Sequence, residues 1–343
     1  MPVNSRYTVK KCGAEDISAV MDFFGENHDP THSFAANKRF VDWQYYMPDA
    51  GEYNILIAKG DSGMLGVLAY IPNTFFDSEM LPERKFIWTT NWLVKRGYKG
   101  FVGLDLLYSL PKHENCENIG TVGQTAASGM FYQKIGYRIG KLEHYFFVNE
   151  NVGNFKVLSG YNWSCADTPQ ADAERGSLLL KPINSLIGLD SPLILEYLRN
   201  AEPCKSPAFF ENKYVKNPFY KYYIYGIISE GKAAAAMVCR VANHNGANVV
   251  RLVEYIGRAE YLADSRLQDI LDEHNAEYMD FYCAGVPHDM LCQAGFMQNT
   301  GEQGLIVPNY FEPFQNSNIE IAYAYKFPEC CIFKGDGDRD HPR

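Results

Sequence analysis

The 343-residue sequence contains no run that approaches the roughly 20 apolar residues of a membrane-spanning helix. Its first residues, MPVNSRYTVKKCG, lack the apolar core of a secretory signal peptide. Positive charge is scarce: 32 Lys and Arg stand against 41 Asp and Glu, a formal net charge of -9. A dedicated nucleic-acid binder needs a basic face. Membrane, secreted and nucleic-acid-binding proteins are therefore disfavoured, and a cytoplasmic location is expected.

Regular cysteine spacing is also missing. The nine cysteines, an odd number, include no C-x-x-C pair and one adjacent pair, Cys330–Cys331. Disulfide frameworks and zinc sites use paired, regularly spaced cysteines, so reduced and mostly buried thiols are expected. Asp336, Asp338 and Asp340 alternate like the opening of a calcium loop, but no Glu lies twelve positions on. We therefore expect no metal, and either a solvated acidic tail or carboxylates that contact a substrate.

The sequence does contain apolar material for two cores. Hydrophobic residues make up 46% and aromatic residues 14% of the chain. Its length exceeds the roughly 250–300 residues at which single cores usually stop growing. In the first half, hydrophobic periodicity predicts a strand (6–13), two helices (14–27 and 34–47), a hairpin (53–71), a strand (86–94), a helix (100–110), a strand (118–124), a helix (126–136) and a closing strand or pair (137–149).

The second half repeats this order. The expected elements are a strand (176–183), helices (189–201 and 207–217), a hairpin (220–242), a strand (248–257), a helix (261–275), a strand (277–285) and a helix (287–296). The segment FYQKIGY in the first half is matched by MLCQAGF in the second. The sequence thus predicts an α/β fold with mixed sheets flanked by helices, in two copies: residues 1–155, a polar linker at 156–175, and residues 176–343.

One turn concentrates the basic residues. In TTNWLVKRGYKGFVGLDLLYSL, an apolar strand leads through Lys95, Arg96 and Lys99 into a helix. The first turn of a helix presents unpaired N–H groups and the positive end of the dipole. Gly100 and Gly103 allow close approach of the backbone. The turn is therefore a candidate site for an anion such as a phosphate.

This turn, the element order and FYQKIGY together resemble the GCN5-related N-acetyltransferase superfamily. In that family the loop after the fourth strand, Gln/Arg-x-x-Gly-x-Gly/Ala, holds the pyrophosphate of acetyl-coenzyme A on backbone amides. Only Gly103 matches that motif, because Tyr98 and Phe101 replace its first residue and its first glycine. The resemblance implies acetyl-CoA, or another acyl-CoA, as co-substrate. The residues expected to bind it are Leu93, Val94, Lys95, Arg96, Tyr98, Lys99, Gly100, Phe101, Val102, Gly103, Gln124, Thr125 and Ser128.

The resemblance also implies a mechanism. FYQKIGY corresponds to the family's Phe-Tyr-x-x-x-Gly-Phe, whose tyrosine lies beside the coenzyme sulfur and serves as general acid, so Tyr132 is expected in that role. The acceptor attacks the thioester directly, and a main-chain N–H near Leu93–Val94 binds its oxygen. The base is left open among His32, His28, Glu83, Glu143 and His144, with His32 and His144 preferred because histidine titrates near neutral pH.

The second copy lacks the basic turn: EYIGRAEYLADSRLQDIL has one glycine and flanking acids. We expect the second copy to have lost coenzyme binding and either to have a structural role or to form part of the acceptor pocket. The tandem arrangement is similar to acetyltransferase-fold proteins of bacterial surface-polysaccharide synthesis, which implies an amino-sugar or sugar-nucleotide acceptor and leaves a homodimer possible. Two alternatives stay open: an aminoacyl-tRNA-dependent peptide-bridge transferase, disfavoured by the net charge, and a non-catalytic binding protein.

Overall fold

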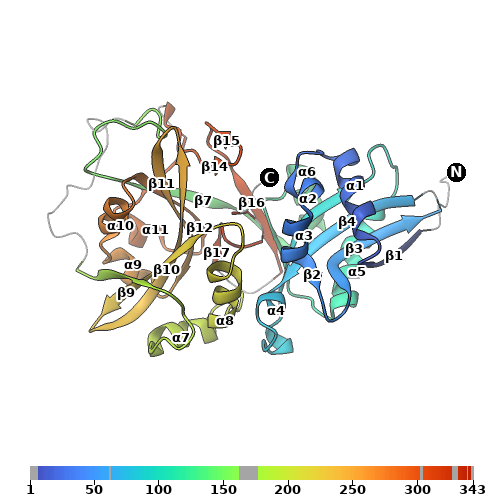
Figure 1. Ribbon diagram of the computed structural model, residues 1–343, viewed down its shortest axis with the longest axis horizontal. Helices are drawn as coiled ribbons and strands as arrows, with labels where there is room; N and C mark the ends of the chain where they lie inside the picture. Colours follow the sequence, from blue (N-terminus) through green and yellow to red (C-terminus); the bar gives the residue numbers. More distant parts are fainter. Residues whose placement is uncertain are drawn as a thin grey trace.

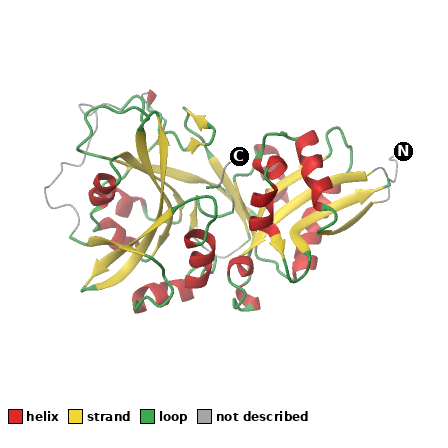
Figure 2. Cartoon of the chain, viewed as in Figure 1, coloured by secondary structure: helices red, strands yellow, loops and turns green. Residues whose placement is uncertain are grey.

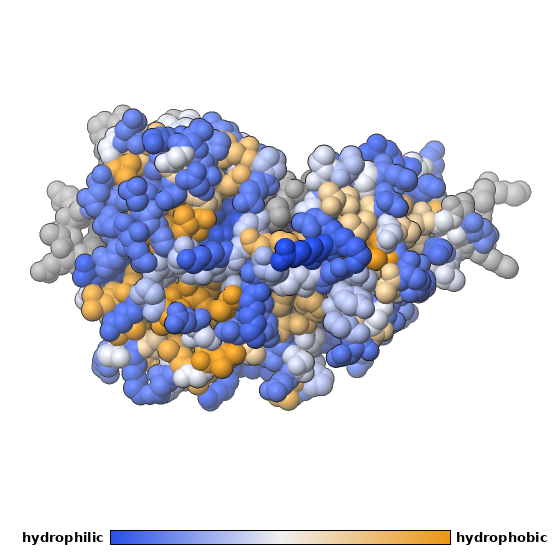
Figure 3. Space-filling view, viewed as in Figure 1, coloured by the Kyte–Doolittle hydropathy of each residue, from blue (hydrophilic) through white to orange (hydrophobic). Residues whose placement is uncertain are grey.

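The computed structural model describes residues 7–61, 63–161, 177–301, 304–326, 331–337 and 339–340 (Figure 1). Most of the expected linker, together with Asp338 and Cys330, lies outside these ranges. None of the helices within them has the length and apolar character needed to cross a membrane. The molecule has two lobes with an indentation between them, and the face seen in Figure 3 is mostly hydrophilic with small apolar patches.

One mixed sheet runs through both lobes. Within the described ranges fifteen strands join it, and its path is β1-β3-β4-β5-β6-β16-β7-β12-β11-β10-β9-β8. The strands are β1 (Tyr7–Gly13), β2 (Tyr46–Met47), β3 (Glu52–Gly60), β4 (Gly63–Pro72), β5 (Ile87–Val94), β6 (Ile119–Val122), β7 (Arg138–Val148), β8 (Leu179–Ile183), β9 (Tyr222–Ser229), β10 (Lys232–His244), β11 (Ala247–Ile256), β12 (Ala276–Ala284), β13 (Met297–Gln298), β16 (Ile321–Tyr325) and β17 (Ile332–Phe333). A separate hairpin is formed by β14 (Tyr310–Phe311) and β15 (Phe314–Gln315).

Helices cover both faces of the sheet (Figure 2). They are α1 (Ile17–Asn27), α2 (Ser33–Ala36), α3 (Lys38–Tyr45), α4 (Asn73–Phe76), α5 (Val102–Glu114), α6 (Ala126–Lys134), α7 (Pro192–Asn200), α8 (Pro207–Phe210), α9 (Ala259–Ala263), α10 (Leu267–Glu273) and α11 (His288–Gln293), with a 3-10 turn η1 (Pro82–Arg84) and a π-helical turn η2 (Glu211–Val215). The apolar core under α1–α3 continues into the C-terminal half, where Phe76 packs edge-on against Phe209 at 5.5 Å between ring centroids. A second core lies under α5 and α6.

Three predicted helices are each divided in two. The pattern at 34–47 forms α2 and α3, because the Asn37 side chain accepts a hydrogen bond from the amide of Phe40 (3.0 Å) and starts a new helix. The pattern at 261–275 forms α9 and α10. Between them the main chain of Leu178 bonds to the carbonyl of Asp264 (2.9 Å) and to the amide of Arg266 (3.3 Å), which interrupts the helical ladder. The prediction at 207–217 likewise becomes α8 followed by η2.

The two halves exchange strands at their junction. The first part of β7, Arg138 to Leu142, pairs with β16, while its second part, Glu143 to Val148, pairs with β12 of the C-terminal half. Strand β16 comes from the far end of the chain and fills the place between β6 and β7. The closing strand predicted at 137–149 is therefore a single strand shared by both halves, and neither half completes its sheet alone.

Candidate functional site

Strands β5 and β6 separate halfway along β5. They are parallel and pair from Ile87↔Ile119 to Thr89↔Thr121, where the pairing ends. On the other side of β5, Thr89 faces Tyr70 and Trp92 faces Leu68. The two residues of β5 between Thr89 and Trp92 therefore oppose the single residue of β4 between Leu68 and Tyr70. Such a β-bulge bends the strand that carries it. The rest of β5 therefore diverges from β6 and leaves a gap in the sheet.

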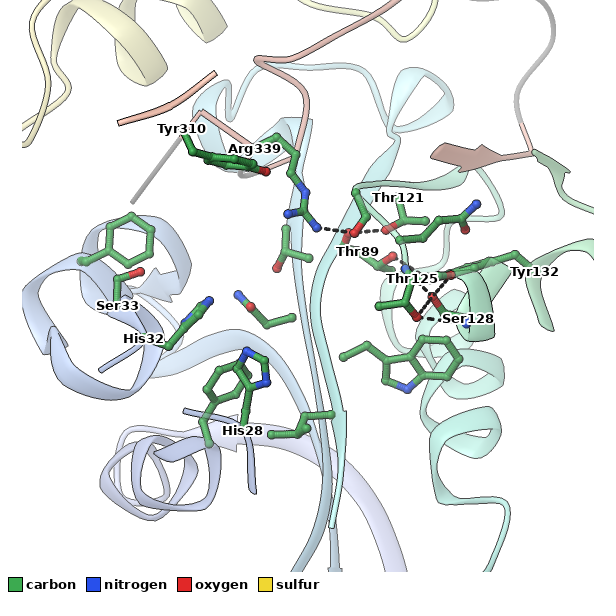
Figure 4. A pocket seen from close by; sticks show the side chains of 18 residues that line it. His28, His32, Ser33, Thr89, Thr121, Thr125, Ser128, Tyr132, Tyr310 and Arg339 are labelled. Atoms are coloured by element: carbon green, nitrogen blue, oxygen red, sulfur yellow. Dashed lines mark hydrogen bonds between the residues drawn. The ribbon is translucent and has the colours of Figure 1, made fainter. Parts of the chain in front are cut away.

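A cavity of about 330 Å³ lies at this gap. In Figure 4, His28, His32 and Ser33 form one side, Thr125, Ser128 and Tyr132 the other, and Tyr310 and Arg339 of the C-terminal half lie above the strands. Of the residues predicted from the sequence, those that line it are His28, His32, Leu93, Gln124, Thr125, Ser128 and Tyr132. Helix α6 is positioned by a capping box, in which Thr125 and Ser128 exchange side-chain to backbone hydrogen bonds of 3.2 and 3.0 Å.

Tyr132 presents its hydroxyl from α6 to the floor of the cavity. The side chain is 1% exposed, and its ring contacts Trp92 edge-on at 5.7 Å between centroids. Its oxygen lies 2.9 Å from Oγ1 of Thr89. Burial raises the pKa of the phenol to about 12, against the smaller effect of hydrogen bonding with Thr89 and Thr121. At neutral pH the phenol is protonated and can donate its proton.

The edges of the gap offer one donor and one acceptor. Gly66 faces Val94 in register, and the amide of Lys95 bonds to the carbonyl of Leu65 at 2.9 Å. In an antiparallel pair of this register the Val94 N–H points away from β4, toward the side that β6 has left. Across the gap, Gln124 donates from Nε2 to the carbonyl of Tyr323 (3.1 Å), while its Oε1 has no hydrogen-bond partner among the described residues.

Two histidines face this floor from the loop between α1 and α2. The rings of His28 and His32 lie 5.3 Å apart between centroids. Nδ1 of His32 accepts a hydrogen bond from the amide of Phe34 at 3.2 Å and caps α2. The proton of a neutral His32 therefore sits on Nε2, and Nδ1 is already occupied by the amide of Phe34 and does not serve as a base. His28 is exposed and carries no such constraint.

Arg339 was missed by sequence reasoning. It comes from the C-terminal tail, and its Nε donates to the carbonyl of Val122 at 2.8 Å while Nη2 donates to the carbonyl of Gly123. Gly123 has φ +83°, and a Cβ there would lie 1.6 Å from Nε of Arg339. A lone arginine in GDGDRDHPR carries no local signal of this contact, because its partners lie more than 200 positions earlier in the chain.

The predicted phosphate loop forms an exposed turn beside the cavity. The amide of Tyr98 bonds to the carbonyl of Lys95 (3.0 Å), with Gly97 at φ +77°, and Lys95 and Lys99 are exposed. Helix α5 then begins at Val102, two residues later than the helix predicted at 100–110, with no side-chain cap from Phe101. The first-turn amides of α5 thus have no capping oxygen from that residue.

Gly103 has a packing role in this helix. A Cβ at that position would lie 3.2 Å from both Trp92 and Val94, closer than ordinary van der Waals contact. The glycine therefore lets α5 pack directly on the part of β5 that borders the gap. The other predicted loop residues, including Arg96, lie outside the cavity, and the amide of Arg96 bonds to Oδ1 of Asn27 at 2.9 Å.

Three residues considered as bases lie elsewhere. His144 is buried at the β7–β12 junction and stacks on Tyr282 at 3.9 Å between centroids. Burial, with a smaller effect of Arg251, lowers its pKa to about 3, so it stays neutral. Glu83 is exposed in η1, before β5 begins. Glu143 accepts a hydrogen bond from Tyr145 at 2.9 Å on β7. None of them lines the cavity, and the geometry gives none of them a place as base.

The corresponding gap in the C-terminal half is filled by the chain itself. Strand β17 pairs with β12, and the amides of Lys334 and Gly335 bond to the carbonyls of Tyr282 on β12 (3.2 Å) and Val253 on β11 (2.9 Å). The tail thus occupies the space between β11 and β12. Leu291, fully buried in α11, stands where the matched segments place Tyr132 in the first half, so no phenol is present there.

The tail is buried, so the expectation of a solvated acidic segment is wrong for its described residues. Asp336 is fully buried and lies 2.8 Å from Nζ of Lys205, which also pairs with Glu254. Asp340 is 4% exposed, and its carboxylate lies 3.2 Å from Nε of Arg240. Ion pairs therefore explain how these two carboxylates can be buried. Within the described ranges, no three His, Cys, Asp or Glu side chains cluster as metal ligands would.

No family model and no curated protein matches the sequence. Solved structures match along nearly the whole chain. A GCN5-related N-acetyltransferase from Anabaena variabilis ATCC 29413 is 10% identical with a TM-score of 0.58, and the match covers 93% of this chain and 72% of that one. A conserved protein of unknown function from Enterococcus faecalis V583 is 11% identical with a TM-score of 0.52 and the same coverage, 93% and 72%.

A third match is the GCN5-related glucosamine N-acetyltransferase region of a fungal multi-domain β-N-acetylglucosaminidase. It is 11% identical with a TM-score of 0.53, and the match covers 95% of this chain and 38% of that one. These likenesses show that the chain has the GCN5-related N-acetyltransferase fold, with a large mixed sheet flanked by helices. The predicted fold class is confirmed.

Proposed function

We propose that this chain is an acyl-CoA-dependent acyltransferase that transfers the acyl group to an amine or hydroxyl of a small acceptor in the cavity at the β5–β6 gap. The observation that carries the proposal is the position of Tyr132, a protonated and buried phenol on the floor of that cavity. The fold supports it, because a GCN5-related N-acetyltransferase matches 93% of this chain with a TM-score of 0.58.

The donor fits along the edge of the gap. The exposed Lys95 and Lys99, with the first-turn amides of α5, would hold its diphosphate. The Val94 amide points to where the thioester oxygen would lie and would stabilise charge that develops there. The unpartnered Oε1 of Gln124 is an acceptor for an amide N–H of the pantetheine arm. A buried acceptor left without a partner costs about 1–3 kcal/mol, which a donor group would offset.

The transfer itself uses one acid and one base. The acceptor nitrogen or oxygen forms a bond to the thioester carbon, and the C–S bond breaks. The leaving thiolate takes the phenolic proton of Tyr132. The described lining residues include no carboxylate, so the proton of the acceptor goes to His28 or to water. His32 lines the acceptor side of the cavity and, with Nδ1 held by the amide of Phe34, is not assigned the role of base.

We place the donor only in the N-terminal half. The tail fills the equivalent gap of the C-terminal half, and that half contributes Tyr310 and Arg339 to the acceptor side of the cavity. This supports two tandem acetyltransferase-like domains, residues 1–155 and 176–343, that exchange strands and work as one unit. An amino sugar or sugar nucleotide of surface-polysaccharide synthesis remains the acceptor class proposed, and the likeness to the fungal glucosamine N-acetyltransferase region supports an amino sugar.

Calorimetry and thiol release test this function on the full-length chain. Acetyl-CoA is titrated into the protein, and release of coenzyme thiol is then followed with glucosamine as acceptor. Saturable donor binding and acceptor-dependent thiol release are expected. Absence of donor binding at millimolar acetyl-CoA would refute the proposal. Both halves must be present in the sample because β7 and β16 complete each other's sheet.

A further inference from the structure

We infer that the acceptor carries an oxyanion, a phosphoryl or carboxylate group, and that Arg339 binds it. The inference rests on the proposed function only for the identification of the cavity as the acceptor site. It adds the chemical class of the acceptor and the residue that selects it. Acceptors with several positive charges, such as polyamines, are disfavoured by the same site.

The cavity is positively polarised in an acidic protein. The chain has a formal net charge of -9, yet the described lining residues comprise Arg339, two histidines, hydroxyl and amide side chains, and apolar groups, without an aspartate or glutamate. An acceptor with a net positive charge would find no carboxylate among the described lining residues and would meet a guanidinium. An anion would find that guanidinium and the hydroxyl donors around it.

Half-buried Arg339 has no acidic partner among the described residues, whereas two buried basic side chains of the same half do. Lys205 lies 2.8 Å from Asp336, and Arg240 lies 3.2 Å from Asp340. The described contacts of Arg339 are with the carbonyls of Val122 and Gly123. These carbonyls use two of the five N–H donors of a guanidinium. They orient the group without neutralising its charge, so the remaining donors can serve an oxyanion.

The fold holds this guanidinium at the cavity. Figure 4 shows the Arg339 side chain descending from the tail toward Thr89 and Thr121, beside the ring of Tyr310. On either side of it in the sequence, Asp336 and Asp340 fix the tail through buried ion pairs. Gly123, where any side chain would collide with Arg339, leaves room for the contact. A preorganised cation of this kind costs little ordering entropy when the ligand binds.

Matched amino sugars test the inference. Calorimetry on the full-length protein measures the affinity for glucosamine, glucosamine 6-phosphate, 2-amino-2-deoxyglucuronic acid and spermidine. We expect either or both anionic sugars to bind on the order of 10- to 100-fold more tightly than glucosamine, as for a charge-assisted hydrogen bond, and spermidine to bind most weakly. The sugar that binds more tightly identifies the oxyanion as phosphoryl or carboxylate.

Substitutions test whether Arg339 causes the preference for anionic sugars. Arg339→Gln is expected to abolish the preference for the anionic sugar, Arg339→Lys to retain part of it, and Arg258→Gln, a change to an exposed arginine 3.6 Å from Glu260, to leave it intact. Equal wild-type affinities for glucosamine and both anionic sugars would overturn the inference, as would a preference that survives Arg339→Gln. The wild-type comparison stands even where a variant fails to fold.

The two proposals fail separately in these measurements. If acetyl-CoA does not bind but the anionic sugar binds through Arg339, the transferase function falls and the anion site stands. If thiol release proceeds equally well with glucosamine, glucosamine 6-phosphate and the amino uronic acid, the anion site falls and the transferase function stands.

Discussion

The phenolic oxygen of Tyr132 lies 2.9 Å from Oγ1 of Thr89, the last residue of β5 that pairs with β6. Thr89 also lies 3.2 Å from the carbonyl of Gly120, which can only accept. Thr89 therefore donates to Gly120 and accepts from Tyr132. Rotation about the phenolic C–O bond is enough to redirect that proton from Thr89 into the gap, where the proposed thiolate would leave.

Replacement of Tyr132 by phenylalanine should separate chemistry from folding. Thr89 keeps its bond to Gly120, so the loss of unfolding free energy should be about 1 kcal/mol. Loss of a general acid typically lowers kcat by about 10²- to 10⁴-fold, while acetyl-CoA affinity should be nearly unchanged. Tyr137→Phe is the matched control, because Tyr137 packs edge-on against Tyr132 and does not line the cavity. Equal kcat values for the two variants would remove Tyr132 from the mechanism.

Between pH 8 and pH 10, the pH dependence of kcat/KM should show no decrease caused by ionisation of Tyr132. The pKa of Tyr132 is raised to about 12 by burial, so the phenol keeps its proton at every pH well below that value. Between pH 8 and pH 10, kcat/KM should therefore show no decline from loss of this proton. Steady-state rates measured across this interval, with protein stability checked at each pH, test the assignment. A fall in kcat/KM that is present in the wild type and absent in Tyr132→Phe would contradict it.

Charge reversal in the loop before α5 should weaken donor binding. In Lys95→Glu/Lys99→Glu, acids replace two exposed cations beside the first-turn amides of α5. The dissociation constant for acetyl-CoA should rise at least tenfold at low salt, and the difference should shrink as ionic strength rises. The control Lys112→Glu/Lys134→Glu makes the same change of net charge at exposed positions near the ends of α5 and α6. Similar losses of affinity in both variants would argue against a phosphate site at the loop.

The buried Lys205 should be far more important to folding than an exposed lysine in a similar pair. Lys205 holds Asp336 of the tail and Glu254 of β11, and all three are buried. Lys205→Met leaves two buried acids without their partner and should lower the unfolding free energy by about 3–5 kcal/mol. Lys232→Met breaks an exposed pair with Asp190 (2.9 Å) and should cost less than about 1 kcal/mol. Chemical denaturation of the two variants makes the comparison, and equal effects would contradict it.

Local sequence patterns were enough to predict the strands and the helix that surround Tyr132. The strand at 86–94, the strand at 118–124 and the short helix after it were predicted nearly as observed in β5, β6 and α6, because periodicity and turn residues are read within a few positions. The segment FYQKIGY located Tyr132 itself. The resemblance to the acetyltransferase family, and not periodicity, indicated Leu93, Gln124, Thr125 and Ser128, which line the cavity.

The features that could not be predicted from the sequence depend on contacts between residues far apart in the chain. The insertion of β16 beside β6 and the contact of Arg339 with Val122 join residues about 200 positions apart, for which a single sequence carries no signal. His144 was considered as a base because a free imidazole titrates near pH 6.5. Burial at the β7–β12 junction removes that property, and burial there follows from a strand exchange that local patterns do not reveal.

A crystal structure of the full-length protein with acetyl-CoA tests the central claim most directly. The diphosphate should lie against Lys95, Lys99 and the first turn of α5, with the thioester oxygen on the amide of Val94 and the sulfur within hydrogen-bond reach of the Tyr132 hydroxyl. Donor bound instead between β11 and β12, or bound with its sulfur remote from Tyr132, would contradict the account.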